Sequence, residues 1–416
     1  MMKNREGRSD ESPLRSTRVL TGLRLCSGSV PATASESRIH PRFPNANSTG
    51  GIQMTITHLL DIAPGPENPR NSEGAFLTLK NGKTAFIWSR YRGSSADDHA
   101  YAEIAMITWD GESFSEPRIL VRPEPSTDET NCMSVSAARM NNGDAAVFYL
   151  VKHRGISSEY IMRRSPDDFE TLEAPVRVVS PLYPGYYVIN NDRVVRDHAG
   201  RWLVPAAWHP STMGYHGQPD HVDGRSRAFV CASDDDGRTW RQLSDFLSLP
   251  GGAHSGTGLQ EPGLSVLPGG TLYGYYRTDL GRHYESFSED GGVTWTDPRP
   301  SPFTAPASPL LIKRNPYSGQ YLAVWNPTPE TPFRWLGQKK PSIWTGGRTP
   351  LCVALSEDGL HFGAPVIIED DPLGGFCYPA VHFTGEKSFL LSYCAGSEKT
   401  GDEMCLVRTR IVSVSL

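Results

Sequence analysis

The segment SDDDGRTW at residues 233–240 returns as SEDGGVTW at residues 288–295, and both follow the pattern S-x-D-x-G-x-T-W. The Asp carboxylate can accept hydrogen bonds from nearby backbone N–H groups, Gly adopts turn conformations that other residues resist, and the closing aromatic ring packs against a sheet. Shorter versions occur at 165–169 and 356–362, and a similar turn occurs at 109–114. We interpret these turns as structural and expect no chemistry from them.

The spacing of the turns suits one four-stranded sheet per repeat. Successive turns lie 55 to 68 residues apart when they are counted from Thr108, Ser165, Ser233, Ser288 and Ser356. Apolar strand candidates next to turn residues lie at 75–79, 145–149, 263–267 and 389–393. Five marked turns, together with one blade closed by the two ends of the chain, predict an all-β fold that is a six-bladed β-propeller.

Residues 1–53 differ in character from the rest of the chain. They are polar, rich in Ser and Pro and without periodicity, which is typical of disorder. The apolar run at 19–25 is short and interrupted by Arg24, so it does not fit a signal peptide. Because Met54 opens a strand-like run, we predict a propeller domain over 54–416 and a disordered or mis-called N-terminal extension over 1–53.

Charge and cysteine usage argue against several classes of partner. The 41 basic and 46 acidic residues give a net charge of −5, whereas a nucleic-acid binder usually shows a basic excess. No apolar run approaches the roughly 18 residues that a membrane span needs. The seven cysteines are scattered and contain no C-x-x-C pair, so reduced buried thiols are favoured over disulfides or a zinc site.

These observations set the expected cofactors and compartment. We expect no metal or organic cofactor, no nucleic-acid partner and no membrane association. The absence of a recognisable signal peptide and the pattern of cysteines favour a cytoplasmic localisation. The sequence indicates no particular oligomeric state.

The S-x-D-x-G-x-T-W turns resemble the Asp-boxes, or BNR repeats, of the sialidase (neuraminidase) superfamily. The resemblance extends over about residues 60–416, and it gains strength when the active-site pattern of that family is followed along the chain. It implies a sialidase-like propeller and a glycosidase activity, exo-α-sialidase, that removes terminal sialic acid from a sialoside or another anionic glycan.

The resemblance also implies three arginines that hold the substrate carboxylate, and here they are Arg70, Arg277 and Arg348. A guanidinium suits this role because it offers paired N–H donors and keeps its charge. Arg277 ends the pattern E-x-x-x-x-x-L-P-x-G-x-L-x-x-x-x-R, which begins at Glu261. Arg70 stands where that family has an R-I-P motif, although the Ile-Pro is absent here.

The catalytic groups follow from the same resemblance. An aspartate in the loop after the second strand of the first blade would act as acid and base, and Asp97 is preferred over Asp98. Tyr378 would be the nucleophile, and Glu261 would accept its proton. A neutral phenol suits a sugar whose anomeric carbon bears a carboxylate, because an anionic nucleophile would be repelled.

Two further features depart from the sialidase pattern. The segment 187–193 brings Asn191 and Arg193 to the start of the third blade, where they could bind substrate. Beyond it, His209 ends an apolar strand and is followed by His216 and His221. The spacing of these histidines matches no compact zinc motif, so structural or solvent-facing roles are favoured over a metal.

The sequence therefore leaves alternatives to a sialidase open. A sialidase-like hydrolase or lyase acting on another anionic sugar, such as a rhamnosyl-glucuronate end, would need His209, Asn191 and Arg193 in the pocket. A non-catalytic carbohydrate-binding propeller is the third interpretation. Each candidate residue also has a purely structural interpretation, as a salt-bridge partner, a core aromatic or part of a polar turn.

Overall fold

The computed structural model describes residues 54–154, 157–180, 182–213, 219–251, 254–327, 348–397 and 406–416. All of them belong to one compact unit, Asn45–Leu416. These residues form β-strands and a single 3-10 turn, η1 (Pro125–Thr127). None of the described residues forms a helix long and apolar enough to cross a membrane. The predicted extension at 1–53 lies outside the described residues.

The first three blades follow one another along the chain. Blade 1 contains β2 (Asn71–Thr78), β3 (Thr84–Tyr91), β4 (Ala102–Trp109) and β5 (Arg118–Val121). Blade 2 contains β6 (Glu129–Arg139), β7 (Ala145–His153), β8 (Ser158–Ser165) and β9 (Val176–Val179). Blade 3 contains β10 (Gly185–Val188), β11 (Val195–Arg196), β12 (Trp202–Met213), β13 (Pro219–Val222), β14 (Arg227–Ser233) and β15 (Arg241–Gln242).

The other three blades complete the ring. Blade 4 contains β16 (Gln260–Val266), β17 (Leu272–Arg277), β18 (Arg282–Ser288) and β19 (Arg299–Thr304). Blade 5 contains β20 (Leu311–Arg314), β21 (Tyr321–Trp325), β22 (Leu351–Ser356) and β23 (Val366–Glu369). Blade 6 contains β24 (Gly375–Phe383), β25 (Ser388–Gly396), β26 (Arg408–Ser415) and β1 (Thr55–Ile62).

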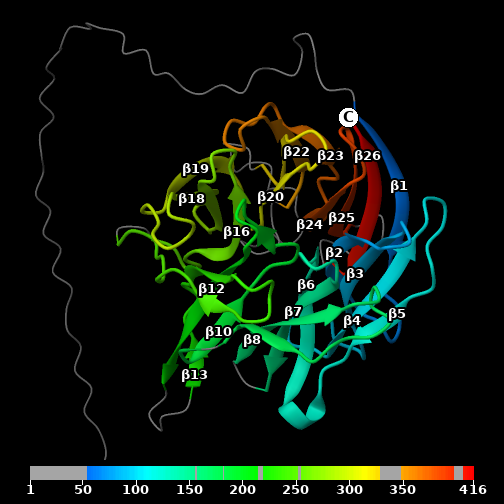
Figure 1. Ribbon diagram of the computed structural model, residues 1–416, viewed down its shortest axis with the longest axis horizontal. Coiled ribbons are helices and arrows are strands. Elements are labelled where there is room, and N and C mark those ends of the chain that lie inside the picture. Colours follow the sequence, from blue (N-terminus) through cyan, green and yellow to red (C-terminus); the bar gives the residue numbers. More distant parts are fainter. Residues whose placement is uncertain are drawn as a thin grey trace, which may run out of the picture. The chain divides into compact units, whose positions relative to one another are not determined.

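The last blade is closed by the two ends of the described chain. Strand β1 pairs antiparallel with β26, so that Thr57 faces Ser413 and Asp61 faces Arg410. Figure 1 shows β1 and β26 side by side, with β2, β6, β16, β20 and β24 around the centre of the ring. The prediction of an all-β, six-bladed propeller closed by its own ends is confirmed.

The Asp-box turns, which are residues 165–171, 233–240, 288–295 and 356–362, connect the third and fourth strands of blades 2 to 5. In the second of them, Asp235 accepts bonds from the Ser233 hydroxyl (2.8 Å) and from the backbone and hydroxyl of Thr239 (2.8 and 2.6 Å). The Trp240 ring nitrogen donates to the carbonyl of Gly237 at 3.1 Å. These short-range bonds satisfy the turn internally, as its sequence predicts.

Apolar side chains are buried mainly between neighbouring blades. Blades 2 and 3 share a cluster that contains Phe148, Tyr160, Tyr187 and Phe229, each at most 2% exposed. Similar clusters lie at the other five blade interfaces, including the one between blades 6 and 1. Full burial of one such ring contributes about 1.5–3 kcal/mol. The ring of interfaces therefore serves as the core and leaves the centre available for polar side chains.

Candidate active site

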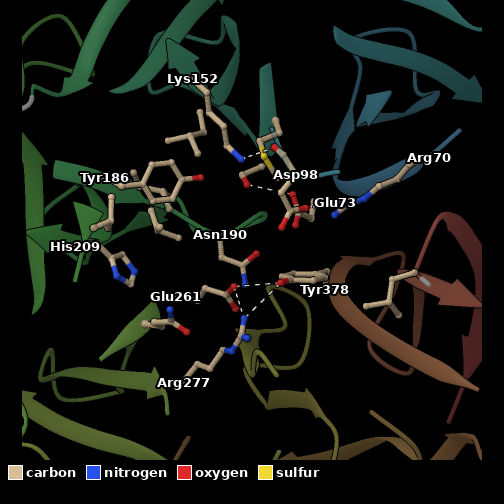
Figure 2. Close-up of a pocket in the computed structure, with 18 of the residues that line it drawn as sticks. Arg70, Glu73, Asp98, Lys152, Tyr186, Asn190, His209, Glu261, Arg277 and Tyr378 are labelled. Atoms are coloured by element: carbon tan, nitrogen blue, oxygen red, sulfur yellow. Dashed lines mark hydrogen bonds and ion pairs between the residues drawn. The ribbon is translucent and has the colours of Figure 1, made fainter. Parts of the chain in front are cut away.

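A central pocket of about 440 Å³ opens where the inner strands of several blades converge. This volume suits a small ligand such as a sugar. Its lining includes seven of the ten site residues expected from sequence, which are Arg70, Asp98, His209, Glu261, Arg277, Arg348 and Tyr378. Figure 2 shows two groups of polar side chains facing each other across the pocket.

The first group, the tyrosine cluster, consists of Tyr378, Glu261 and Arg277. The Tyr378 hydroxyl donates to Glu261 Oε1 at 3.2 Å. The same Oε1 accepts from Arg277 Nη1 at 2.5 Å, and Nη1 lies 3.4 Å from the tyrosine oxygen. The second glutamate oxygen, Oε2, is buried without a hydrogen-bond partner. The carboxylate is thus held beside the phenol as its proton acceptor, and it retains an oxygen with unused acceptor capacity.

Arg348 completes the surroundings of this cluster. Its guanidinium lies 5.5 Å from the centre of the Tyr378 ring, and its side chain is buried. Nη1 donates to Cys377 Sγ and Nη2 to the carbonyl of Ala307, both at 3.1 Å, whereas Nε is buried without a partner. A guanidinium has five N–H donors, so these two bonds leave donors available to an anionic ligand.

Tyr378 is a neutral phenol in this environment. Burial raises its pKa well above the ordinary value of 10, and the charge of Glu261 raises it further, although Arg277 and Arg348 oppose the shift. Burial by itself would lower the pKa of Arg277, but the adjacent Glu261 raises it instead, so the guanidinium keeps its charge. A phenol of this kind becomes a nucleophile only if a base takes its proton as the new bond forms.

The second group, the acid cluster, consists of Glu73, Asp98, Arg70 and Lys152. Asp98 lies in the loop between β3 and β4 and pairs with Arg70 Nη1. Lys152 Nζ, from β7, donates to the backbone carbonyl of Asp98 at 2.6 Å, and Arg70 Nη1 donates to the carbonyl of Ala96 at 3.2 Å. Two cations from different elements therefore hold the loop against the pocket.

Glu73 was not expected from the sequence. It lies on β2, it is only 4% exposed and it lines the pocket, where its Oε2 accepts from the Ser134 hydroxyl at 3.1 Å. Burial raises its pKa to about 7, despite the opposing charge of Arg70. The residues around it, Asn71, Ser72 and Gly74, are polar or small, so nothing in the local sequence marked Glu73 as a buried carboxyl.

Asp98 has the opposite character. The surrounding protein partly desolvates its carboxylate and opposes ionisation, although 63% of the side chain remains exposed. The charges of Arg70 and Lys152 outweigh that effect and lower the pKa of Asp98. Asp98 is therefore an ionised member of an ion pair at neutral pH, whereas Glu73 is partly protonated.

His209 reaches the pocket from β12 and is 5% exposed. Its Nδ1 lies 3.0 Å from the carbonyl of Asp223, which can only accept, so Nδ1 carries the hydrogen and Nε2 is left with a lone pair. Burial lowers its pKa, although the Asp223 carbonyl and the charge of Glu261 oppose the shift. His209 is therefore neutral at neutral pH.

Irregular backbone aims several of these side chains. Strands β2, β6, β16 and β24 each have a register irregularity at a pocket residue, and these residues are Glu73, Ser134, Glu261 and Tyr378. The last three adopt positive φ angles of 56°, 41° and 55°, respectively. A β-bulge re-aims a side chain, and positive φ in a non-glycine residue stores strain that is found mainly at functional sites. The four bulges mark the pocket independently of its volume.

The other expected site residues lie elsewhere. Asp97 is exposed, and its carboxylate accepts from the backbone of His99 at 2.8 Å in a local turn. Asn191 donates to the carbonyls of Gly74 (2.9 Å) and Pro379 (3.3 Å), so it ties blade 3 to blades 1 and 6. Neither residue lines the pocket.

Arg193 borders a different cavity, which it shares with Asp192 and Lys313. Its Nη2 donates to the carbonyl of Leu310 at 2.7 Å, and its guanidinium lies 5.8 Å from the centre of the Tyr275 ring. His216 lies outside the described residues, as does the side chain of His221. Among the described residues, no three His, Cys, Asp or Glu side chains gather in a way that could hold a metal ion.

Sequence reasoning also missed two amides in the pocket, as it missed Ser134, Lys152 and Tyr186. Asn190 Nδ2 is buried without a partner, and Gln260 Oε1 is likewise buried without one. Each precedes a residue singled out in the sequence, Asn191 and Glu261. Their direction could not be read from the chain, because a shift of one residue in a strand turns a side chain to the other face.

Comparisons with known proteins place this architecture in a family. The family model of the BNR repeat-like domain matches residues 86–390. The chain belongs to the BNR repeat-like domain family. None of the curated proteins compared with it matches this BNR repeat-like chain.

Solved structures match the fold of this BNR repeat-like propeller at low identity. A Dyadobacter fermentans protein of unknown function has a TM-score of 0.63 at 15% identity, over 87% of this chain and 99% of its own. The Ruminococcus gnavus intramolecular trans-sialidase has a TM-score of 0.60 at 12% identity, and the match covers 85% of this chain and 96% of that one. A Hadza microbial sialidase has a TM-score of 0.59 at 15% identity, and the match covers 83% of this chain and 66% of that one. The fold is thus sialidase-like.

Proposed function

We propose that this protein is an exo-acting glycosidase, an exo-α-sialidase that hydrolyses terminal sialic acid from glycans. The observation that carries the proposal is the tyrosine cluster, in which the Tyr378 hydroxyl donates to Glu261 at 3.2 Å inside a pocket that Arg70, Arg277 and Arg348 also line. A tyrosine–glutamate pair beside carboxylate-binding arginines suits a glycoside whose anomeric carbon bears a carboxylate.

The charge of the pocket supports an anionic substrate. Four cations, Arg70, Lys152, Arg277 and Arg348, line it together with three carboxyl groups. Because the pKa of Glu73 is raised to about 7, part of the negative charge is absent at neutral pH. The cations are therefore in excess, and a bound carboxylate would restore the balance.

The reaction would proceed in two steps across the pocket. In the first step the Tyr378 oxygen bonds to the anomeric carbon while its proton passes to Glu261, and the glycosidic bond breaks as a carboxyl of the acid cluster protonates the leaving oxygen. In the second step that carboxylate takes a proton from water, the resulting hydroxide displaces the tyrosine oxygen, and Glu261 returns the proton to it. Both steps conserve protons and need no oxidant.

A second candidate is a hydrolase or lyase acting on another anionic sugar, such as a uronate-capped glycan. It is favoured by His209, which is neutral, lines the pocket and has a lone pair on Nε2. Two observations disfavour it. Asn191 and Arg193 do not line the pocket, whereas Arg70, Arg277 and Arg348 all do. The sialoside therefore remains the first substrate class to test.

The test uses the full chain with 4-methylumbelliferyl N-acetylneuraminide and, in parallel, a 4-methylumbelliferyl glucuronide. Turnover of the sialoside that is lost in Tyr378→Phe would support the proposal. Tyr393→Phe is the matched control, because it removes a hydroxyl from the same blade that bonds to Glu369 at 2.6 Å outside the pocket. A folded wild type that turns over neither substrate contradicts a glycosidase, and turnover of the glucuronide alone selects the second candidate.

A further inference from the structure

We propose that Glu73, rather than Asp98, is the group that protonates the leaving oxygen and later deprotonates the water. The inference rests on the proposed glycosidase function and changes the identity of its acid and base. The two carboxyl groups lie close together in Figure 2, on the opposite side of the pocket from Glu261 and Arg277. The choice between them depends on which one can hold and release a proton.

The geometry of Glu73 suits a proton donor. It sits at the bulge of β2, which directs its side chain into the pocket lining, and the strand on which it lies is buried on both sides. Its Oε2 accepts a hydrogen bond from the hydroxyl of Ser134, which adopts φ 56° at the bulge of β6. Two bulged strands of different blades thus meet at this carboxyl and hold it in place.

Asp98 is held in an ion pair and is less suited to donate a proton. It pairs with Arg70, and its backbone carbonyl accepts from Lys152 at 2.6 Å. To act as an acid it would first have to take up a proton against two neighbouring cations. We therefore assign Asp98 a positioning role: it holds the Arg70 guanidinium, which also donates to the Ser72 hydroxyl at 3.1 Å.

The electrostatic surroundings agree with this division. The pKa of Glu73 is raised to about 7, because burial and the charges of Asp98 and Glu261 outweigh Arg70 and Lys152, whereas the pKa of Asp98 is lowered. The titratable and charged groups that face Glu73 are Arg70, Tyr91, Asp98, Lys152, Tyr186, Glu261 and Cys394. An acid whose pKa lies near the working pH can both donate and recover its proton.

The decisive experiment compares two leaving groups in two variants, Glu73→Gln and Asp98→Asn. A sugar hydroxyl, as in sialyllactose, leaves only if it is protonated, whereas an aryl oxide such as 4-methylumbelliferone leaves readily without help. We expect Glu73→Gln to lose about 10²–10⁴-fold in kcat on sialyllactose and far less on the aryl glycoside. We expect Asp98→Asn to lose activity on both substrates by a similar factor, mainly through KM.

A pH profile gives a second measurement that does not need Glu73→Gln to fold. Wild-type kcat/KM should fall on the alkaline side near pH 7, as the acid loses its proton. Ser134→Ala should move that limb to higher pH, because its hydroxyl donates to the ionised Glu73 carboxylate. Asp98→Asn should move the limb to lower pH, because it removes a neighbouring negative charge.

The outcomes separate the inference from the proposed function. Asp98 is the acid if Asp98→Asn loses much more kcat on sialyllactose than on the aryl glycoside and its kcat/KM no longer falls at alkaline pH, while Ser134→Ala keeps the wild-type pH profile. In that case the assignment of Glu73 fails, although the glycosidase function stands. If the folded wild type cleaves neither sialoside nor uronate-capped glycoside, the function and the inference fail together.

Discussion

The Asp-box turns and the bulges of the inner strands both need unusual backbone, but they use it differently. In the turn at 233–240, positive φ falls on Asp236 and Gly237, and in the turn at 288–295 it falls on two glycines. In the bulges it falls on Ser134, Glu261 and Tyr378, all of which line the pocket. Glycine adopts such angles without steric cost and Asp tolerates them better than most residues, whereas a larger residue such as Tyr stores of order 1–3 kcal/mol of strain. The turns favour stability, and the bulges sacrifice some stability to direct side chains.

The two regions also differ in the reach of their hydrogen bonds. Asp235 bonds to residues at most four positions away along the chain. Tyr378 and Glu261 are separated by 117 positions and come from blades 6 and 4. A substitution in a turn should therefore lower the free energy of unfolding and leave activity unchanged. A substitution of a pocket residue at a bulge should lower activity and leave the free energy of unfolding largely unchanged or higher.

The largest expected effect is that of Tyr378→Phe. Removing the hydroxyl should lower kcat on 4-methylumbelliferyl N-acetylneuraminide by at least about 10³-fold, because the proposed nucleophile is lost. The melting temperature should stay within a few degrees of the wild-type value, since the ring remains. A variant that keeps a tenth of the wild-type kcat would remove Tyr378 from the mechanism.

Arg277→Lys should have the next largest effect. A lysine cannot present paired donors to a substrate carboxylate while also contacting Glu261, so kcat/KM should fall by about 10²-fold. Steady-state kinetics on the same substrate would measure this loss. Arg299→Lys is the matched control, because Arg299 pairs with Glu285 at 3.0 Å outside the pocket, and it should leave kcat/KM unchanged. Equal losses in both variants would mean that the first reflects folding.

Glu73→Gln should change how stability depends on pH. The folded-state pKa of about 7 lies above the ordinary 4.5, so the folded protein holds a proton that the unfolded chain releases, and stability falls as pH rises from about 4.5 to 7. The glutamine variant lacks this loss. Its free energy of unfolding should therefore exceed that of the wild type by about 3 kcal/mol at pH 8 and match it near pH 4.

Denaturant unfolding at both pH values measures the difference, and Glu289→Gln in the exposed turn at 288–295 serves as the control. If the free energy of unfolding of Glu73→Gln does not exceed that of the wild type at pH 8, then ionising Glu73 does not destabilise the folded protein and its pKa is not raised.

Gly237→Ala should have the smallest effect and only on stability. At φ 83° an alanine is strained, and its Cβ would lie 2.9 Å from Met140 Cε. We expect a loss of about 2 kcal/mol in the free energy of unfolding with unchanged kcat/KM. Gly143→Ala, at φ 88° with no atom near the new Cβ, isolates the backbone strain and should cost about 1 kcal/mol. If Gly237→Ala loses activity while its free energy of unfolding is unchanged, the turns are not purely structural and the distinction between turns and bulges is wrong.

Much of the fold followed from local pattern. The turns at 233–240 and 288–295 carry their hydrogen-bond partners within one octapeptide, so their structure could be predicted from the chain. The strand at 145–149 is a continuous apolar run that follows turn residues, and it lies within β7. Closure by the two ends followed from the count of repeats and is confirmed by the pairing of β1 with β26.

The site could be anticipated only where a motif marks it. Glu261 and Arg277 belong to one pattern, and the structure brings them within 2.5 Å. Asp97 and Asp98 are adjacent and chemically alike, so nothing local says which of them turns toward the pocket. Glu73 lies in a strand without any motif, and its importance depends on Ser134 and on the cations of the acid cluster.

The repeated turns were enough to predict a ring of four-stranded blades, and the motifs were enough to predict a set of arginines, a tyrosine and a glutamate at family-like positions. The folded chain was needed to see that Glu73 faces the pocket, that Asp98 pairs with Arg70, and that Arg193 borders another cavity. Turns could be predicted because they close through bonds a few residues long. The direction of a strand side chain could not, because it reverses with each residue and is reset by every bulge.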